Sequence, residues 1–130
     1  MTPTFRPGAN LAMKVPPRRF DQTVAFYRDV LRFEALGPLE GEAGESVRFR
    51  FGDKILWIDR VDGLSQAELW LEVLTDDVEA ASRYLAQQQC IRRDEIEPLP
   101  EGVRGFWIAS PSDVIHLVTE SPSITGAADE

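Results

Sequence analysis

Carboxylates and tryptophans recur on the apolar, strand-like segments of this sequence. Glu68, Trp70 and Glu72 alternate along one segment, so their side chains point to the same face of a strand. Trp57 and Trp107 lie on two other segments of the same kind. Indole rings and carboxylates on a shared, partly desolvated wall favour an aromatic or cationic ligand. The indoles also suit an ordinary core, and the carboxylates a solvated rim.

His116 is the single histidine of the chain and lies in a further apolar segment. It alternates with Val114 and Val118, so the three side chains share one face of a strand. An imidazole titrates near neutral pH and can contact a ligand, act as an acid or base, or hold a metal ion. The same pattern suits a packed histidine that bonds to a neighbouring carboxylate or carbonyl. A site of two histidines and one carboxylate needs a second imidazole, which one chain does not supply.

The charge balance argues against nucleic acid as a partner. Lys and Arg number 14 against 22 Asp and Glu, which gives a formal net charge of -8. Nucleic-acid binding needs a basic face, so no nucleic-acid partner is expected. The acidic surplus suits a cationic ligand, although it equally serves solubility.

Cysteine usage and hydropathy indicate the compartment. The single cysteine, Cys90, cannot form a disulfide within the chain, which points to a reducing environment. No apolar run approaches the ~18 residues needed to span a bilayer, and no apolar signal core opens the sequence. We therefore expect a soluble, cytoplasmic protein with no membrane partner.

The elements that must position these groups follow the order β-α-β-β-β twice. Strands are expected at 10–15, 47–51, 54–61, 68–73, 103–109 and 114–119. The two helices carry apolar stripes, formed by Phe20, Val24, Tyr27 and Leu31 in one and by Val78, Ala81 and Leu85 in the other. Residues 1–9 contain two prolines and a glycine, which predicts an irregular lead-in. The repeats define modules at about 10–62 and 66–121 of a single domain, 1–130.

This pattern predicts an α+β fold. Strands outnumber helices, and each module has one helix to cover one face of its strands. The uncovered faces can be sheltered only if they curl toward each other. We therefore expect two βαβββ modules that form a curved, mixed β-sheet cup of about eight strands.

Two motifs carry a resemblance to a known superfamily. The first is the helix sequence Val24–Leu31 (VAFYRDVL), after which Arg32 stands where the family usually has a glycine. The second is Gly105–Val118 (GFWIASPSDVIHLV), where the family has an Asp-Pro-Asp-Gly turn before a strand that ends in a glutamate metal ligand. In this order, on a doubled frame, they resemble the vicinal oxygen chelate superfamily over about residues 10–120. That superfamily includes glyoxalase I, the bleomycin and fosfomycin resistance proteins and the extradiol dioxygenases.

The resemblance implies positions for a divalent metal ion. Family members hold the ion with histidine or glutamate near the start of each module's first strand and on the strands that end the modules. The corresponding residues here are Asn10, either Glu68 or Trp70, either Trp57 or Asp59, and His116. By the same resemblance, the face of His116 looks into the cup, and the protein works as a homodimer.

These observations support three hypotheses of function. The first is a metal-independent binding protein, with no cofactor, that sequesters an aromatic or cationic compound. Its expected ligand contacts are Trp57, Trp70 and Trp107, which stack on the compound, and Glu68, Glu72 and His116, which orient it. The alternative is a divergent lyase, isomerase or dioxygenase that holds a divalent metal ion with His116, Glu68 and Asp59. The third is a protein–protein module whose cup is filled by its own side chains.

Overall fold

The computed structural model describes residues 2–37 and 46–120. By its contacts the chain divides into two compact units, Asn10–Leu69 (the first unit) and Met1–Ala9 with Trp70–Glu130 (the second unit). Within the described residues, no helix is long and apolar enough to cross a membrane.

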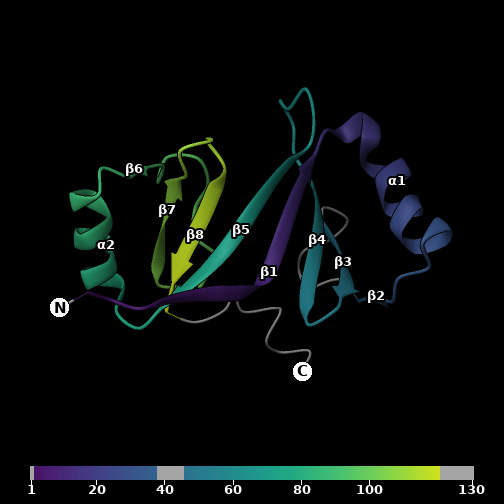
Figure 1. Cartoon of the computed structure of the whole chain (residues 1–130). Coiled ribbons are helices and arrows are strands. Elements are labelled where there is room, and N and C mark those ends of the chain that lie inside the picture. The colour runs from purple at the N-terminus through teal and green to yellow at the C-terminus, as the bar shows by residue number, and fades with distance from the viewer. Residues whose placement is uncertain (1, 38–45, 121–130) are drawn as a thin grey trace. The chain divides into compact units, whose positions relative to one another are not determined.

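The described residues of the first unit form four strands and one helix that continues as a π-helical turn. Its elements are β1 (Phe5–Val15, from Asn10 on), α1 (Pro17–Ala25), η1 (Phe26–Val30), β2 (Ala35–Leu36), β3 (Ser46–Phe51) and β4 (Lys54–Arg60). The strands lie in the order β2-β3-β4-β1. The β1–β4 pair is parallel, and the β2–β3 and β3–β4 pairs are antiparallel. In Figure 1, α1 flanks this group of strands.

The helix of the first unit begins earlier and ends differently than its apolar stripe predicts. It starts at Pro17, where a missing backbone N–H costs nothing and the fixed φ suits a helix. Phe20 and Val24 are buried against the strands, as expected. The wider winding of η1 then turns the chain, so Leu31, the last residue of the predicted stripe, is 41% exposed.

The second unit repeats the arrangement. Its elements are the first residues of β1, β5 (Glu68–Thr75, from Trp70 on), α2 (Val78–Gln87), β6 (Ile91–Arg92), β7 (Gly105–Ala109) and β8 (Ile115–Thr119). The strands lie in the order β5-β8-β7-β6, with β5–β8 parallel and the other two pairs antiparallel. Asp77 caps α2, because its Oδ1 accepts from the Ala80 N–H at 3.0 Å. Figure 1 shows α2 beside β7 and β8.

The prediction of an irregular lead-in at residues 1–9 is wrong for residues 5–9, because β1 begins at Phe5. The segment is held by contacts with distant residues of the second unit. The Thr4 N–H donates to Asp76 Oδ1 at 3.0 Å, which lowers the pKa of that carboxyl, and the Thr75 hydroxyl donates to the Thr4 carbonyl at 2.8 Å. The prolines and the glycine of residues 1–9 predict a loop here. Hydrogen bonds with residues about 70 positions away stabilise a strand instead.

The strands confirm the expected fold class. Followed through β1, which contributes residues to both units, the hydrogen-bonded order is β2-β3-β4-β1-β5-β8-β7-β6 in one mixed sheet. Each unit holds one helix against one face of its strands. The fold is therefore α+β, with two βαβββ modules.

Candidate ligand-binding faces

Strand alternation assigns each predicted residue of the second unit to one of two faces. In register, Glu72 lies opposite Leu117, and Leu117 lies opposite Trp107. Trp70 precedes Glu72 by two residues and so shares its side of β5. The core cluster under α2 contains none of these residues; it is formed by Val78, Ala81, Phe106 and Val118. We call the side of Trp70, Glu72 and Trp107 the helix-free face of the second unit.

His116 lies on the other side of the strands, which corrects the expectation that its face is the binding face. It pairs in register with Ile108, which packs in the α2 cluster together with Val118. Its Nδ1 lies 2.9 Å from the Val114 carbonyl oxygen, as in a packed histidine. In the turn before β8, Asp113 adopts a φ of +66°, in the left-handed region that favours glycine. The pairing of β8 with β5 and β7 brings Leu117, one position after His116, to the helix-free face.

Trp70 and Trp107, the tryptophan pair, meet edge to face on the helix-free face of the second unit. Their ring centroids are 5.4 Å apart at an interplanar angle of 68°. Trp107 is only 5% exposed, and its Nε1–H has no acceptor among the residues that the structure describes. A buried donor without an acceptor costs about 1–3 kcal/mol. A ligand oxygen or nitrogen that displaced the side chains over this N–H and accepted its hydrogen bond would recover that cost.

Residues of the loop before β7 pack against the tryptophan pair. Ile96, Leu99 and Val103 join the cluster that contains Trp107 and Leu117. The same loop holds the backbone, since the Trp107 N–H donates to Asp94 Oδ1 at 3.0 Å. This face is therefore partly filled by the protein's own side chains.

Glu72 is buried and binds the protein's own backbone. It is 6% exposed, and its Oε1 accepts from the Ala9 N–H at 2.9 Å. A Cβ on Gly8 would overlap the Glu72 side chain, with only 2.8 Å left to the Glu72 Cβ. The carboxylate therefore anchors the first part of β1 against β5, whereas Glu68 on the same strand is exposed.

Replacing Gly8 by Ala should displace the Glu72 side chain and lower the free energy of unfolding by about 1–3 kcal/mol. Chemical denaturation of the wild type and the variant would measure it. In the double variant Gly8→Ala/Glu72→Gly the overlap is removed, so Gly8→Ala should cost less in this background than it costs in the wild type. Additive losses would show that the two residues do not interact.

The first unit has a polar helix-free face, on the side opposite α1. Lys14 Nζ and Asp59 Oδ2 are 2.9 Å apart, with side-chain exposures of 7% and 15%. The Ser46 hydroxyl donates to the other carboxylate oxygen of Asp59 at 2.7 Å. Asp59, a candidate metal ligand, is therefore committed to a buried ion pair.

Trp57 lies on the same face of the first unit within a second polar network. Its Nε1–H donates to Asn10 Oδ1 at 2.7 Å, and the Arg48 guanidinium lies 5.5 Å from its ring centroid. Arg48 Nε in turn donates to the Gly37 carbonyl at 3.1 Å. Trp57 is thus joined to protein groups, and this tryptophan does not belong to the tryptophan pair.

Sequence reasoning missed Lys14 and Arg48, which are 6% and 5% exposed. A basic residue that alternates with apolar residues along a strand usually lies on the solvent-facing side of that strand. The signal that could have identified them is the pairing between strands, in which Lys14 lies opposite Asp59 and Arg48 lies opposite Trp57. These two buried cations do not suit a cationic ligand on the first unit.

The residues present do not fit the divalent ion that the fold family implies. His116 and Glu68 point to opposite faces of their strands, Asn10 Oδ1 accepts from Trp57, and Asp59 pairs with Lys14. Residues 2–37 and 46–120 bring together no group of three or more His, Cys, Asp or Glu side chains.

The strand order, the two helices and the two units define the vicinal oxygen chelate fold, the fold of the glyoxalases, bleomycin resistance proteins and extradiol dioxygenases. Solved structures share it. The chain is similar to the Mn(II)-bound glyoxalase from Novosphingobium aromaticivorans, with a TM-score of 0.66 and 18% identity over 92% of this chain and 40% of that one. The chain is also similar to a glyoxalase/bleomycin resistance protein/dioxygenase superfamily member from Vibrio splendidus 12B01. The TM-score is 0.55 and the identity 13%, over 89% of this chain and 98% of that one.

A third similar structure is the homoprotocatechuate 2,3-dioxygenase from Brevibacterium fuscum in complex with 3,4-dihydroxyphenylacetate. Its TM-score is 0.58 at 18% identity, over 94% of this chain and 38% of that one. The chain thus spans about two fifths of the glyoxalase and of this dioxygenase. No protein-family model and no curated protein matches the chain. The likeness establishes the fold, and activity is argued from the site.

Proposed function

We propose that the protein binds and sequesters an aromatic small molecule on the helix-free face of the second unit, without a metal ion. The observation that carries this proposal is the buried Nε1–H of Trp107, which has no acceptor within the part of the chain that is described. A ligand that accepts this bond relieves the cost of a desolvated donor, which is a larger gain than an exposed hydrogen bond offers.

Trp70 supports the aromatic class of ligand. Trp70 is partly exposed beside Trp107, so one indole can contact a flat ring while the other donates the hydrogen bond. Among proteins of this fold, the Brevibacterium fuscum dioxygenase binds an aromatic acid, 3,4-dihydroxyphenylacetate.

The competing function is a protein–protein module. The packing of Ile96, Leu99 and Val103 on Trp107 favours it, because the face is then partly closed by the chain itself. The two functions differ in one measurable respect. A sequestering protein binds small aromatic compounds saturably, whereas a filled face does not.

The deciding experiment is a titration with neutral, anionic and cationic aromatic compounds that contain a hydrogen-bond acceptor, followed by tryptophan fluorescence and melting temperature. We expect saturable quenching and a raised melting temperature for a subset of them. Trp107→Phe should weaken that binding by about tenfold or more, because it removes the donor and part of the ring contact.

Trp57→Phe is the matched control, since Trp57 lies in the first unit and its N–H is satisfied by Asn10. It should leave the affinity unchanged. Two outcomes would exclude sequestration on this face and favour the protein–protein module. One is binding that is equally strong in Trp107→Phe, and the other is a panel of compounds that changes neither the fluorescence nor the melting temperature.

A further inference from the structure

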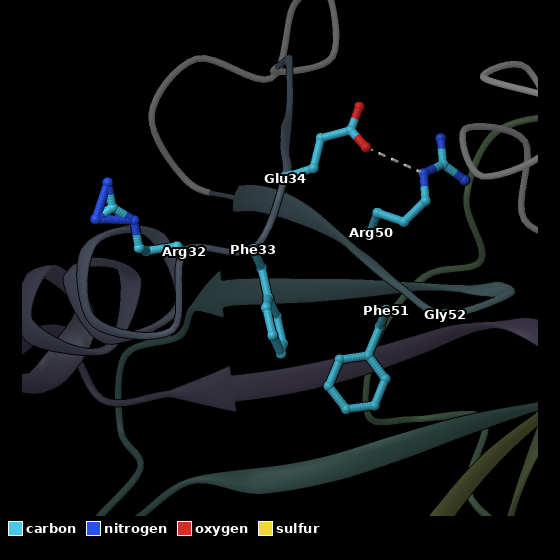
Figure 2. A pocket seen from close by; sticks show the side chains of 6 residues that line it. All are labelled: Arg32, Phe33, Glu34, Arg50, Phe51 and Gly52. Atoms are coloured by element: carbon cyan, nitrogen blue, oxygen red, sulfur yellow. Dashed lines mark ion pairs between the residues drawn. The ribbon is translucent and has the colours of Figure 1, made fainter.

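A pocket lies in the first unit between the end of η1 and the β3–β4 turn. Its volume is about 500 Å³, and it is lined by Arg32, Phe33, Glu34, Arg50, Phe51 and Gly52 (Figure 2). Phe33 packs against the core cluster under α1, which places the pocket on the opposite side from Trp57. It is therefore separate from both helix-free faces. Its volume falls within the ~300–1,000 Å³ that is usual for small-molecule sites.

The apolar lining comes from two aromatic rings. Phe33 and Phe51 have ring centroids 5.7 Å apart and an interplanar angle of 72°. Figure 2 shows the ring of Phe33, between η1 and β2, and the ring of Phe51, at the end of β3, pointing to the same side. Phe51 is 42% exposed, so a flat apolar molecule placed there would remove aromatic surface from water.

Two of the charged residues of the pocket compensate each other. Arg50 Nε lies 3.7 Å from Glu34 Oε1, and the Arg50 N–H donates to the Glu34 carbonyl at 2.9 Å. In Figure 2 this ion pair extends away from the two rings. The third charged residue is Arg32, for whose guanidinium the described residues provide no ion-pair or hydrogen-bond partner. In Figure 2 its exposed side chain extends away from the two rings, so it meets a ligand on them only after it turns toward them.

Arg32 occupies a position where its backbone is unfavourable. Its φ is +61°, in the left-handed region where glycine is favoured. An arginine here costs backbone energy that glycine would not, and it places a cation beside an apolar pocket on a protein whose net charge is -8. A local cation on an acidic protein selects for an anion.

We propose that this pocket binds organic anions with a flat apolar body, such as aromatic carboxylates or sulfonates. The rings of Phe33 and Phe51 contact the body, and the Arg32 guanidinium binds the anionic group. This site is independent of the tryptophan pair and would remain if the proposed function failed.

The test uses a pair of fluorescent probes that differ in charge, 8-anilinonaphthalene-1-sulfonate and its neutral parent N-phenyl-1-naphthylamine. The wild type should bind the sulfonate more tightly. Phe51→Ser should weaken both probes by about tenfold or more, because it removes an aromatic contact. Arg32→Gly should weaken the sulfonate alone by about fivefold, and glycine suits the φ of +61°, so this variant retains its fold.

Matched controls lie in the second unit. Ile91→Ser removes an apolar side chain that is 63% exposed, and Arg83→Ala removes an exposed cation of α2; neither should change the affinity of either probe. Trp107→Phe should also have no effect. Equal sulfonate binding by the wild type and Arg32→Gly, or binding that is lost in Trp107→Phe, would overturn the proposal. So would a change in mass in Phe51→Ser by sedimentation velocity, because it would assign the pocket to self-association.

Discussion

Replacing Lys14 by Met is expected to lower the free energy of unfolding by about 3–5 kcal/mol, because the substitution leaves a buried carboxylate without its cation. Asp59 is the carboxylate, 2.9 Å from Lys14 Nζ and 15% exposed. The Ser46 hydroxyl alone cannot replace the charge of the ammonium. Urea denaturation followed by circular dichroism would measure the loss.

Two further variants test the cause. Lys14→Met/Asp59→Leu removes both charges and should recover most of the loss, since replacing a buried ion pair by apolar side chains is often nearly neutral. Arg28→Ala breaks the exposed pair with Asp29, whose side chains are 54% and 59% exposed, and should cause no measurable change. A loss in Lys14→Met no larger than that in Arg28→Ala would show that burial does not strengthen the first pair.

Replacing Gly105 by Ala is expected to lower the free energy of unfolding by about 3 kcal/mol. A Cβ there would overlap the Val118 carbonyl oxygen and lie 3.2 Å from the Thr119 Cα. Both atoms belong to the backbone of β8, so no side-chain rotation relieves the overlap. The β7–β8 pair must shift instead, which also disturbs Trp107 on the adjacent row. Thermal unfolding and amide exchange of β7 and β8 would report the change.

Gly37→Ala is the matched control, because a Cβ at Gly37 meets no atom of the described residues within 4 Å. It should change stability by less than about 0.5 kcal/mol. Equal melting temperatures for Gly105→Ala and the wild type would mean that the β7–β8 pair accommodates a side chain at this point.

The two proposed sites can fail separately because they lie in different units. The tryptophan pair offers a buried hydrogen-bond donor within an aromatic and aliphatic cluster. The pocket of Phe33 and Phe51 offers ring surface and a cation. Trp107→Phe and Arg32→Gly therefore act on different sites, and either result can be interpreted without the other.

The sequence by itself determined the element order and which residues share a strand face. Glu68, Trp70 and Glu72 alternate as predicted, because side chains of an extended backbone point to alternate sides whatever the context. The apolar stripe of Val78, Ala81 and Leu85 predicted α2, because a helix repeats its contacts every three to four residues. These features depend on neighbours along the chain, so local patterns suffice to predict them.

Only the tertiary structure decided which of those faces are covered and by what. Whether His116 or Leu117 reaches the helix-free face depends on a register that differs by one residue and is set by pairing with β5 and β7. The burial of Lys14 requires Asp59, 45 positions away, and the strand that starts at Phe5 requires partners near Thr75. Contacts between segments far apart in the chain supply the free energy for each arrangement, so no local pattern contains them.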